Sequence, residues 1–309
     1  MSSCGVAARK SKGCGAEMEK PEPRFFLGVD GGGTGCRARL EDAGGAVLGQ
    51  GLSGPATTRL GIDVAWGSIN HAIDAALDEA GFGHERRGEI ATGIGLAGYG
   101  RQGAREALEA LPHAFARIAF STDGHAACLG AHGGRDGGIV IAGTGSLGLG
   151  FVEGREIRVG GYGFPISDEG SGADLGLRAI RLALRAQDGR AEMTALLREV
   201  MGRYNDDPME AVAWMDRAHA TDYARLAPLV IRHADQGDSA GRRIVQAAAE
   251  EIDGIIRALF DRQVPRIALL GGLASAIEPW LSPDLRRRLR PAEGDAVSGA
   301  ILLARGRIG

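Results

Sequence analysis

Two apolar runs, one in each half of the chain, end in a glycine-rich turn, and both have the pattern of β-strands. Phe25–Val29 leads into Asp30–Thr34, and Ile139–Ala142 leads into Gly143–Ser146. Glycines leave backbone N–H groups uncovered by side chains, which suits a concave site for phosphate oxygens. Two such turns predict a nucleotide clamped between two domains.

The same order of elements opens each half of the chain. In the first half we expect strands at Phe25–Val29, Arg37–Glu41, Ala46–Gln50, Ile90–Leu96 and Arg117–Ser121, with helices at Ile62–Ala80 and Gln102–Leu111. In the second half we expect strands at Ile139–Ala142, Leu147–Val152, Ile157–Gly160 and Val264–Leu270, helices between Gly172 and Gln263, and a closing helix at Asp295–Ala304. This alternation predicts an α/β fold built from an internal repeat, each half opening with antiparallel strands.

The distribution of charged residues and cysteines excludes several classes of function. All lysines lie before the first strand, at Lys10, Lys12 and Lys20, so a Walker A lysine is excluded. The net charge of −3 gives no electrostatic case for nucleic acid. The cysteines have no metal-site spacing, and no apolar run is long enough for a membrane span. We expect a cytoplasmic protein with a disordered tail at residues 1–22.

The turn Asp30–Thr34 has three explanations. It could be a plain hairpin turn, since glycine runs are common there. It could belong to a dinucleotide fingerprint through Gly33, Gly35 and Ala38, but a strand follows where that motif needs a helix. It could also be a phosphate hairpin, in which Asp30 holds Mg²⁺ through water while Gly32, Gly33 and Thr34 approach the β- and γ-phosphates. The second turn in the other half favours phosphate.

Asp123 follows an apolar strand and precedes a helical stretch, within Ser121-Thr122-Asp123-Gly124. Ser, Thr or Asp is expected wherever a helix begins, so this segment could be a simple N-cap. Alternatively, a carboxylate at the carboxyl end of a strand, facing a cleft between lobes, can take the proton of an attacking hydroxyl. The sequence leaves both functions open.

A third segment, Gly160 to Gly172, is dense in glycine and carries the adjacent carboxylates Asp168 and Glu169. Glycines bring backbone close to a ligand, and a carboxylate can accept two neighbouring sugar hydroxyls. The plainer explanation is that Ser167 or Asp168 caps the helix beginning near Gly172. The number of glycines favours a ligand.

These motifs together resemble the BadF/BadG/BcrA/BcrD ATPase family of the actin, sugar kinase and Hsp70 superfamily, and within it the bacterial glucosamine kinases and N-acetylglucosamine kinases. The resemblance runs from about Phe26 to Ala304. It implies two ribonuclease-H-like (actin-like ATPase) lobes with a nucleotide and sugar cleft between them. We expect lobes at 23–120 and 121–294, with a helix at about 295–309 packing back on the first.

The resemblance also implies roles for individual residues. Asp123 is expected to be the general base and to bind the sugar near its 6-hydroxyl. The implied ATP-binding residues, with Asp30 holding Mg²⁺, are Asp30, Gly31, Gly32, Gly33, Thr34, Gly143, Thr144, Gly145, Ser146, Gly271, Gly272, Ala296 and Ser298. The implied sugar-binding residues are Thr57, Asp123, Gly160, Gly161, Asp168 and Glu169. Thr57 stands where the family commonly has an asparagine, which puts that contact in doubt.

The sequence and this resemblance together predict an ATP- and Mg²⁺-dependent kinase that acts on the 6-hydroxyl of D-glucosamine, with N-acetylglucosamine as the alternative acceptor. A homodimer is what the family implies. An ATPase activator of a radical dehydratase would need cluster-forming cysteines, and Cys36 and Cys128 lie far apart in sequence. A non-enzymatic sugar sensor is disfavoured by Asp123 and by the absence of an N-terminal helix-turn-helix pattern.

Overall fold

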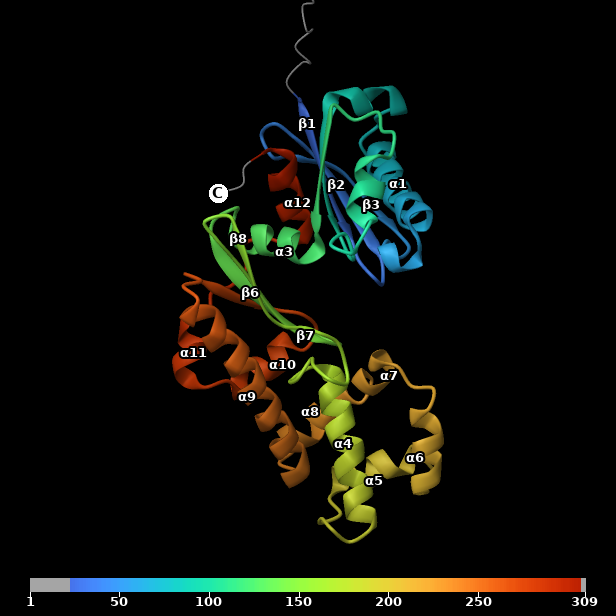
Figure 1. Cartoon of the computed structure of the whole chain (residues 1–309), viewed down its shortest axis with the longest axis vertical. Helices are drawn as coiled ribbons and strands as arrows, with labels where there is room; N and C mark the ends of the chain where they lie inside the picture. Colours follow the sequence, from blue (N-terminus) through green and yellow to red (C-terminus); the bar gives the residue numbers. More distant parts are fainter. Residues whose placement is uncertain (1–22, 307–309) are drawn as a thin grey trace, which may run out of the picture.

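A computed structural model describes residues 23–306, which form two lobes, each built around one β-sheet (Figure 1). The sheet of the first lobe has five strands in the order β3-β2-β1-β4-β5. Its strands are β1 (Phe25–Gly31), β2 (Cys36–Asp42), β3 (Val47–Ser53), β4 (Ile90–Leu96) and β5 (Arg117–Thr122). The first three are antiparallel neighbours, whereas β4 and β5 run parallel to β1. The predicted tail at 1–22 lies outside the described residues.

Helices cover both faces of the first sheet. Helix α1 (Ile62–Glu79) packs on β2 and β3, where its apolar stripe includes the fully buried Ile69 and Ile73. On the other face lies α12 (Ala296–Ala304), which contacts β1 and β4 although it closes the chain. The shorter elements of this lobe are η1 (Thr58–Leu60), η2 (His84–Glu89) and α2 (Ala104–Glu109). Burial of the apolar faces of α1 and α12 holds this layered arrangement together.

The second sheet repeats the opening of the first. Strands β6 (Gly137–Ala142), β7 (Ser146–Val152) and β8 (Arg155–Gly160) are antiparallel neighbours, and β9 (Ile267–Leu270) runs parallel to β6. The order β8-β7-β6-β9 therefore matches β3-β2-β1-β4 of the first sheet. The predicted internal repeat and the α/β class are confirmed.

Between β8 and β9 the chain is helical, as its apolar periodicity predicts. The long helices α4 (Gly172–Gln187) and α9 (Ser239–Asp261) pack together and extend away from the first lobe (Figure 1). The remaining elements of this lobe are α5 (Ala195–Gly202), α6 (Pro208–Met215), α7 (Ala220–Ala224), α8 (Ala227–Asp235), α10 (Ala274–Ile277), η3 (Glu278–Trp280) and α11 (Pro283–Arg288). No helix within residues 23–306 is both long enough and apolar enough to cross a bilayer.

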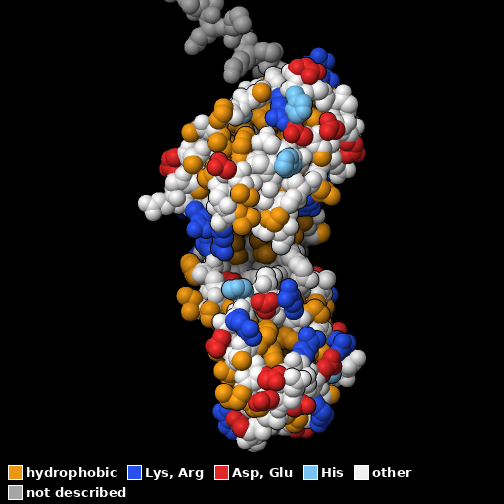
Figure 2. All heavy atoms as spheres, turned by 90° about the vertical axis from the view of Figure 1, so that its right-hand side faces the viewer, with side chains coloured by type: hydrophobic (Ala, Val, Ile, Leu, Met, Phe, Trp, Pro, Cys, Tyr) orange, Lys and Arg blue, Asp and Glu red, His pale blue; other side chains and the backbone are white. Residues whose placement is uncertain are grey.

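The chain crosses between the lobes twice, and the two crossings lie side by side. Helix α3 (Asp123–Ala131) precedes the first crossing and packs both on α12 and on strands of the second sheet. The Glu293 N–H, in the second crossing, donates to the Ala131 carbonyl at 3.0 Å, and Arg135 forms an ion pair with Glu293. Figure 2 shows the constriction of the molecule between the lobes. The lobe limits at residues 120 and 294 remain a proposal, with α3 lying between the two sheets.

Two expected elements are shorter in the structure for local reasons. The late strand begins at Ile267 and not at Val264, because Pro265 has no N–H to donate to a sheet and the pairing with β6 starts after it. Helix α2 begins at Ala104, after Gly103 with φ of 75°, whereas the pattern predicted a start at Gln102. Strand β4 has the predicted bounds, Ile90–Leu96.

Candidate active site

The first glycine turn joins β1 to β2 and is closed by its own backbone. The Gly32 N–H donates to the Gly35 carbonyl at 2.9 Å, which brings the chain back antiparallel. Within the described residues, no hydrogen bond is formed by the N–H groups of Gly33 and Thr34. A methyl group at Gly33 would meet nothing within 4 Å. This turn therefore offers open backbone donors, as a phosphate hairpin requires.

The second turn joins β6 to β7 and sits against the start of α4. The N–H of Gly172 donates to the Gly143 carbonyl at 2.7 Å, and the N–H of Ala173 donates to the Thr144 carbonyl at 3.2 Å. The Ser146 hydroxyl is buried and donates to the Glu169 carbonyl at 2.6 Å, so it ties the turn to the segment that leads into α4. The turn is thus held in place by α4 and by the segment that leads into it.

Asp123 is the first residue of α3, directly after β5. The N-cap of this helix is Thr122, whose hydroxyl accepts the His125 N–H at 3.1 Å, so capping does not use the Asp123 carboxylate. The carboxylate accepts the Gly124 N–H at 2.9 Å. Surrounding protein raises the pKa of Asp123 through desolvation, and the negative charge of Asp30 raises it further. Because Thr122 is the cap, the explanation of Asp123 as a simple N-cap does not fit the structure.

Asp30, Asp123 and Arg37 line one cavity of about 600 Å³. Elements of both lobes supply its other walls, which are Gly124, Ala127, Ile141, Leu147, Leu270, Gly271, Ala292, Gly294, Asp295 and Ala296. A cavity of this size can hold the reacting groups of a small substrate and a nucleotide. The structure thereby brings the predicted base beside the first phosphate turn.

Arg37 is a site residue that the sequence analysis missed. Its guanidinium lies 2.7 Å from a carboxylate oxygen of Asp30 and 3.6 Å from one of Asp295. The neighbouring Asp30 raises the pKa of Arg37, mainly through their hydrogen bond. Two features of the sequence could have indicated Arg37 as a site residue. Asp30 and Arg37 face each other in the β1–β2 hairpin, and the lysine-free core leaves arginine as the cationic side chain for phosphate.

The segment from Gly160 to Gly172 lies beside the second turn. Gly160 and Gly161 have φ of 68° and 70°, and Asp168 has φ of 67°, so the backbone is left-handed at each. The Asp168 carboxylate accepts the Gly163 N–H at 3.2 Å, and burial raises its pKa. Ser171 caps α4 by accepting the Asp174 N–H at 3.2 Å, so neither Ser167 nor Asp168 is the cap. That leaves the Asp168 carboxylate available for a ligand.

Asp168 also lies close to the turn at Gly145. A side chain at Gly145 would collide with the Asp168 carboxylate, since a Cβ there would stand 2.5 Å from an oxygen. Glu169 follows, with a carboxylate oxygen 3.4 Å from the Ser167 hydroxyl. The predicted sugar carboxylates therefore adjoin the predicted phosphate turn.

Thr57 has a different set of contacts. Its side chain is buried, and the hydroxyl donates to the Ala97 carbonyl at 3.2 Å and accepts the Arg59 N–H at 3.4 Å. These bonds cap η1 and tie it to the end of β4. Thr57 does not line the cavity with Asp123, so a direct sugar contact from it remains a prediction.

Four of the residues expected to bind ATP lie apart in the structure, namely Gly271, Gly272, Ala296 and Ser298. Gly272 and Thr144 line a second cavity of about 770 Å³ in the second lobe, whereas Gly271 and Ala296 line the cavity with Asp123. The Ser298 hydroxyl accepts from Arg39 at 2.8 Å and donates to Asp295 at 2.8 Å, in a different cavity. The structure therefore does not bring Ser298 to the pocket of Gly272.

The second cavity has walls that the sequence analysis did not identify. Its apolar walls are Ala224, Ala227, Pro228, Ile231 and Leu273, and its polar ones include Arg232, Asp235 and Gln236. Apolar walls with a few polar groups are typical of sites for a flat base and its ribose. Apart from Gln236, which directly follows α8, and Leu273, which precedes α10, these residues come from α7 and α8, where their spacing is that of ordinary core helices.

The residues around Asp30 fit a magnesium ion. Mg²⁺ in phosphate-transfer sites is usually held by one or two carboxylates together with substrate phosphates and waters. Asp30 and Asp123 supply carboxylate oxygens to one cavity, with the first turn beside them. No cluster of three or more His, Cys, Asp or Glu side chains that could hold a metal ion occurs within residues 23–306.

Comparisons with known proteins agree with this arrangement. Residues 27–304 match the profile of the BadF/BadG/BcrA/BcrD ATPase family. The chain is similar to the glucosamine kinase GspK of Vibrio cholerae, with 39% identity over 280 residues, which are 91% of this chain and 95% of that protein.

Among solved structures, a candidate N-acetylglucosamine kinase from Chromobacterium violaceum is similar with a TM-score of 0.82 and 38% identity, covering 92% of this chain and 100% of that one. A ROK family glucokinase from Streptomyces griseus, solved with glucose and AMPPNP, has a TM-score of 0.51 and 18% identity, covering 91% of this chain and 99% of that one. The second likeness concerns the fold alone, a two-lobed fold of the actin-like ATPase and sugar kinase type.

Proposed function

The chain belongs to the BadF/BadG/BcrA/BcrD ATPase family, and from that premise we propose that it transfers the γ-phosphoryl group of ATP to the 6-hydroxyl of D-glucosamine. The relatives place it among ATP-dependent sugar kinases that act on amino sugars. The acceptor, its hydroxyl and the roles of single residues are our proposal. The observation that supports it most is the cavity shared by Asp123 and the phosphate turn after β1.

Asp123 is the proposed general base. Its carboxylate would take the proton of the 6-hydroxyl as the hydroxyl oxygen bonds to the γ-phosphorus and the bond to the β-phosphate oxygen breaks, releasing ADP. Desolvation and the charge of Asp30 make this carboxylate more basic than an exposed one. It is therefore better suited to accept a proton near neutral pH.

The two glycine turns would hold the phosphates. The N–H groups of Gly33 and Thr34 form no hydrogen bond within the described residues and could donate to phosphate oxygens whose charge grows in the transition state. If Arg37 breaks its ion pair with Asp30, its guanidinium group can move to the phosphate and balance the negative charge there. Asp30 would hold Mg²⁺, which when bound neutralises phosphate charge.

Adenosine would occupy the cavity lined by Gly272 and Thr144. Its apolar walls suit the faces of a purine, and Asp235 and Gln236 can bond to hydroxyl or amine groups. Thr144 belongs to the second turn, so a nucleotide seated there would extend its phosphates toward the first lobe. We leave Ser298 out of this proposed site because of its bonds to Arg39 and Asp295.

We choose D-glucosamine as the proposed acceptor because of its positive charge. Free glucosamine carries an ammonium group, which a site with carboxylates attracts, and Asp168 and Glu169 supply two beside the second turn. N-Acetylglucosamine is the second candidate, supported by the 38% identity to the Chromobacterium violaceum protein. It has no positive charge and needs room for its acetyl group.

A coupled assay of ADP release tests the proposal with glucosamine, N-acetylglucosamine, glucose and no sugar. We expect ATP consumption only with an acceptor, and the highest kcat/KM with glucosamine. Equal consumption without sugar would contradict a kinase, and a higher kcat/KM for N-acetylglucosamine would assign the second candidate. In the Asp168→Asn variant, KM should rise more for glucosamine than for N-acetylglucosamine, because only the former is cationic.

A further inference from the structure

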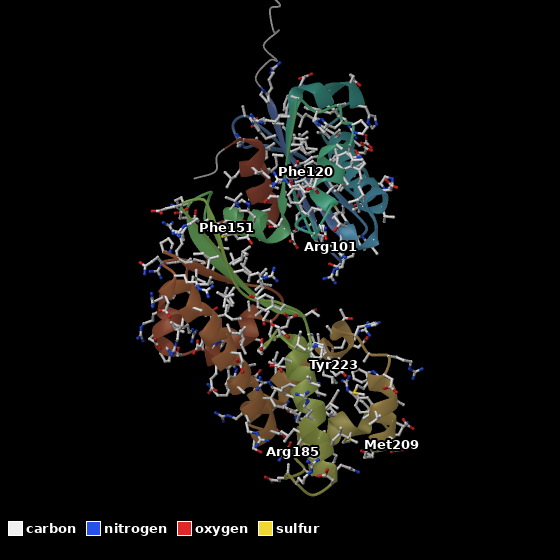
Figure 3. All side chains as sticks on the ribbon, viewed as in Figure 1. Arg101, Phe120, Phe151, Arg185, Met209 and Tyr223 are labelled. Atoms are coloured by element: carbon white, nitrogen blue, oxygen red, sulfur yellow. The ribbon has the colours of Figure 1, made fainter. Side chains whose placement is uncertain are left out.

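A cavity of about 790 Å³ lies between α4 and α9, and none of its lining residues belongs to either cavity described above. We call it the arginine groove, after the five arginines in its lining: Arg178, Arg181, Arg185, Arg190 and Arg243. Figure 3 places Arg185 near the end of α4 that points away from the first lobe. The groove is therefore separate from the candidate active site.

Three of these arginines form no ion pair with a carboxylate of the described residues 23–306. Arg178 pairs with Asp174 and Glu251, and Arg190 pairs with Asp188. Within the described residues, the structure shows no ion pair for Arg181, Arg185 or Arg243. The only acidic residue among the lining residues given for the groove is Glu192.

One further carboxylate lies near the groove but is already engaged. Asp238 caps α9 by accepting the N–H groups of Ala240 and Gly241, each at 3.0 Å. The same carboxylate accepts the Leu196 N–H and the Thr194 hydroxyl, each at 3.0 Å. It is thus committed to backbone and hydroxyl donors and is not paired with an arginine.

The arginines gather positive charge on one side of the groove. Arg178, Arg181 and Arg185 are spaced three and four residues apart, which puts their side chains on one face of α4, and the charge of Arg178 is offset by Asp174 and Glu251. Arg181 and Arg185 are exposed, and like charges at this spacing repel each other. Arg243 adds a further positive charge from the facing helix α9. A bound anion would remove this repulsion.

The floor of the groove is apolar. Leu182, Leu197 and Ile244 are buried core residues that also line it. Guanidinium groups bind phosphate in a bidentate manner, and an apolar floor suits the organic part of a ligand. The volume is within the range of small-molecule sites.

We propose that the arginine groove binds a small organic molecule that carries a diphosphate group. Three arginines without partners, opposed by Glu192, match the two to three negative charges of such a group. The diphosphate would lie between Arg181 and Arg185 on α4 and Arg243 on α9, and its organic part would lie on the apolar floor. This site does not depend on the identity of the sugar acceptor.

Calorimetric titration of the full chain with inorganic pyrophosphate, in EDTA, tests the proposal. The groove variant is Arg181→Ala/Arg185→Ala/Arg243→Ala, and the control is Arg198→Ala/Arg242→Ala/Arg287→Ala, three exposed arginines outside the groove. We expect wild type and control to bind pyrophosphate equally and the groove variant to bind at least tenfold more weakly. A parallel titration of the Arg37→Ala variant separates the groove from the active site, because Arg37 lines the cavity of that site and lies outside the groove, and binding in the groove should persist in this variant.

Three results would overturn the proposal. They are no binding to the wild type at millimolar pyrophosphate, equal binding by the groove variant, and complete loss of binding in the Arg37→Ala variant. Melting temperatures of all variants check that they are folded. If the triple variant is not folded, Arg185→Glu alone should weaken binding at least tenfold, whereas Arg242→Glu should not.

Discussion

At the scale of single residues, the candidate site contains the carboxylate of Asp123, which does not cap the helix on which it lies. Thr122 caps α3, so Asp123 can serve chemistry without loss of the helix start. Its pKa is raised by desolvation and by Asp30. The folded state therefore favours the protonated form of Asp123 compared with the unfolded chain.

We predict that Asp123→Asn lowers kcat at least about a hundredfold, the usual scale of general-base effects, with a modest change in KM for ATP. The same substitution should raise Tm at neutral pH. Because the folded pKa exceeds the unfolded one, the carboxylate's contribution to stability is present at low pH and is lost as pH rises through the folded pKa. Steady-state kinetics and thermal unfolding check both expectations. Near-normal turnover would refute Asp123 as the base.

We also predict the direction of the pH dependence. A general base works when ionised, so kcat/KM should fall as pH falls through the pKa of Asp123. Since that pKa is raised, the acid limb should lie above the value of about 3.9 that is usual for aspartate. A pH profile of kcat/KM, with protein stability confirmed at each pH, gives the position of the limb. A limb at or below the usual value would be inconsistent with the assignment.

At the scale of elements, close packing of α3, α12 and the first sheet depends on glycines, which have no side chain. A Cβ at Gly299 of α12 would stand 1.8 Å from the Ala126 carbonyl oxygen, and one at Gly130 of α3 would stand 1.9 Å from the Asp295 carbonyl oxygen. Each glycine lets one helix approach the other's backbone. The two helices therefore pack as a unit between the lobes.

We predict that Gly299→Ala destabilises the protein by about 1–3 kcal/mol, the usual cost of overpacking a filled interface. Gly254→Ala is the matched control, since Gly254 lies in the exposed interior of α9 and a methyl group there meets nothing within 4 Å. That control should stabilise the protein by about 0.5–1 kcal/mol through helix propensity. Urea unfolding of both variants measures the difference. Equal stability of the two would contradict the packing argument.

The helices and strands could be predicted from the sequence more completely than the cavities that they line. Strands such as β4 are short apolar runs with clear limits, and the two glycine turns are local motifs. By contrast, the walls of the second cavity come from α7 and α8, some eighty residues after the turn they face. Residues such as Pro228 and Ile231 carry no local sign that a pocket, and not a core, lies beside them. Only the three-dimensional packing reveals it.

At the scale of the whole molecule, the two glycine turns that we propose to hold phosphate belong to different lobes. Asp30 and Thr34 lie in the first lobe, whereas Thr144 and Asp168 lie in the second. A substrate that contacts both sets must draw the lobes together, and closure would exclude water from the reacting groups. The paired crossings at Ala131 and Glu293 are the natural pivot.

We predict that the radius of gyration, measured by small-angle X-ray scattering, decreases when glucosamine and AMPPNP bind together. Each ligand alone should give a smaller change, because each makes only part of the contacts that hold the two lobes together. Glucose with AMPPNP is the control for a poorer acceptor. An unchanged radius of gyration at saturating concentrations of both ligands would show that the described arrangement is already closed.

The position of α12 has a consequence for biosynthesis. This helix comes after the whole second lobe in the chain, and it covers the face of β1 and β4 on which Gly28 and Gly93 lie. At about 5–20 residues per second, the ribosome delivers it many seconds after the first sheet has emerged. During that interval the first lobe lacks the cover that α12 gives this face. The first lobe therefore completes its fold only after the second lobe has been synthesised.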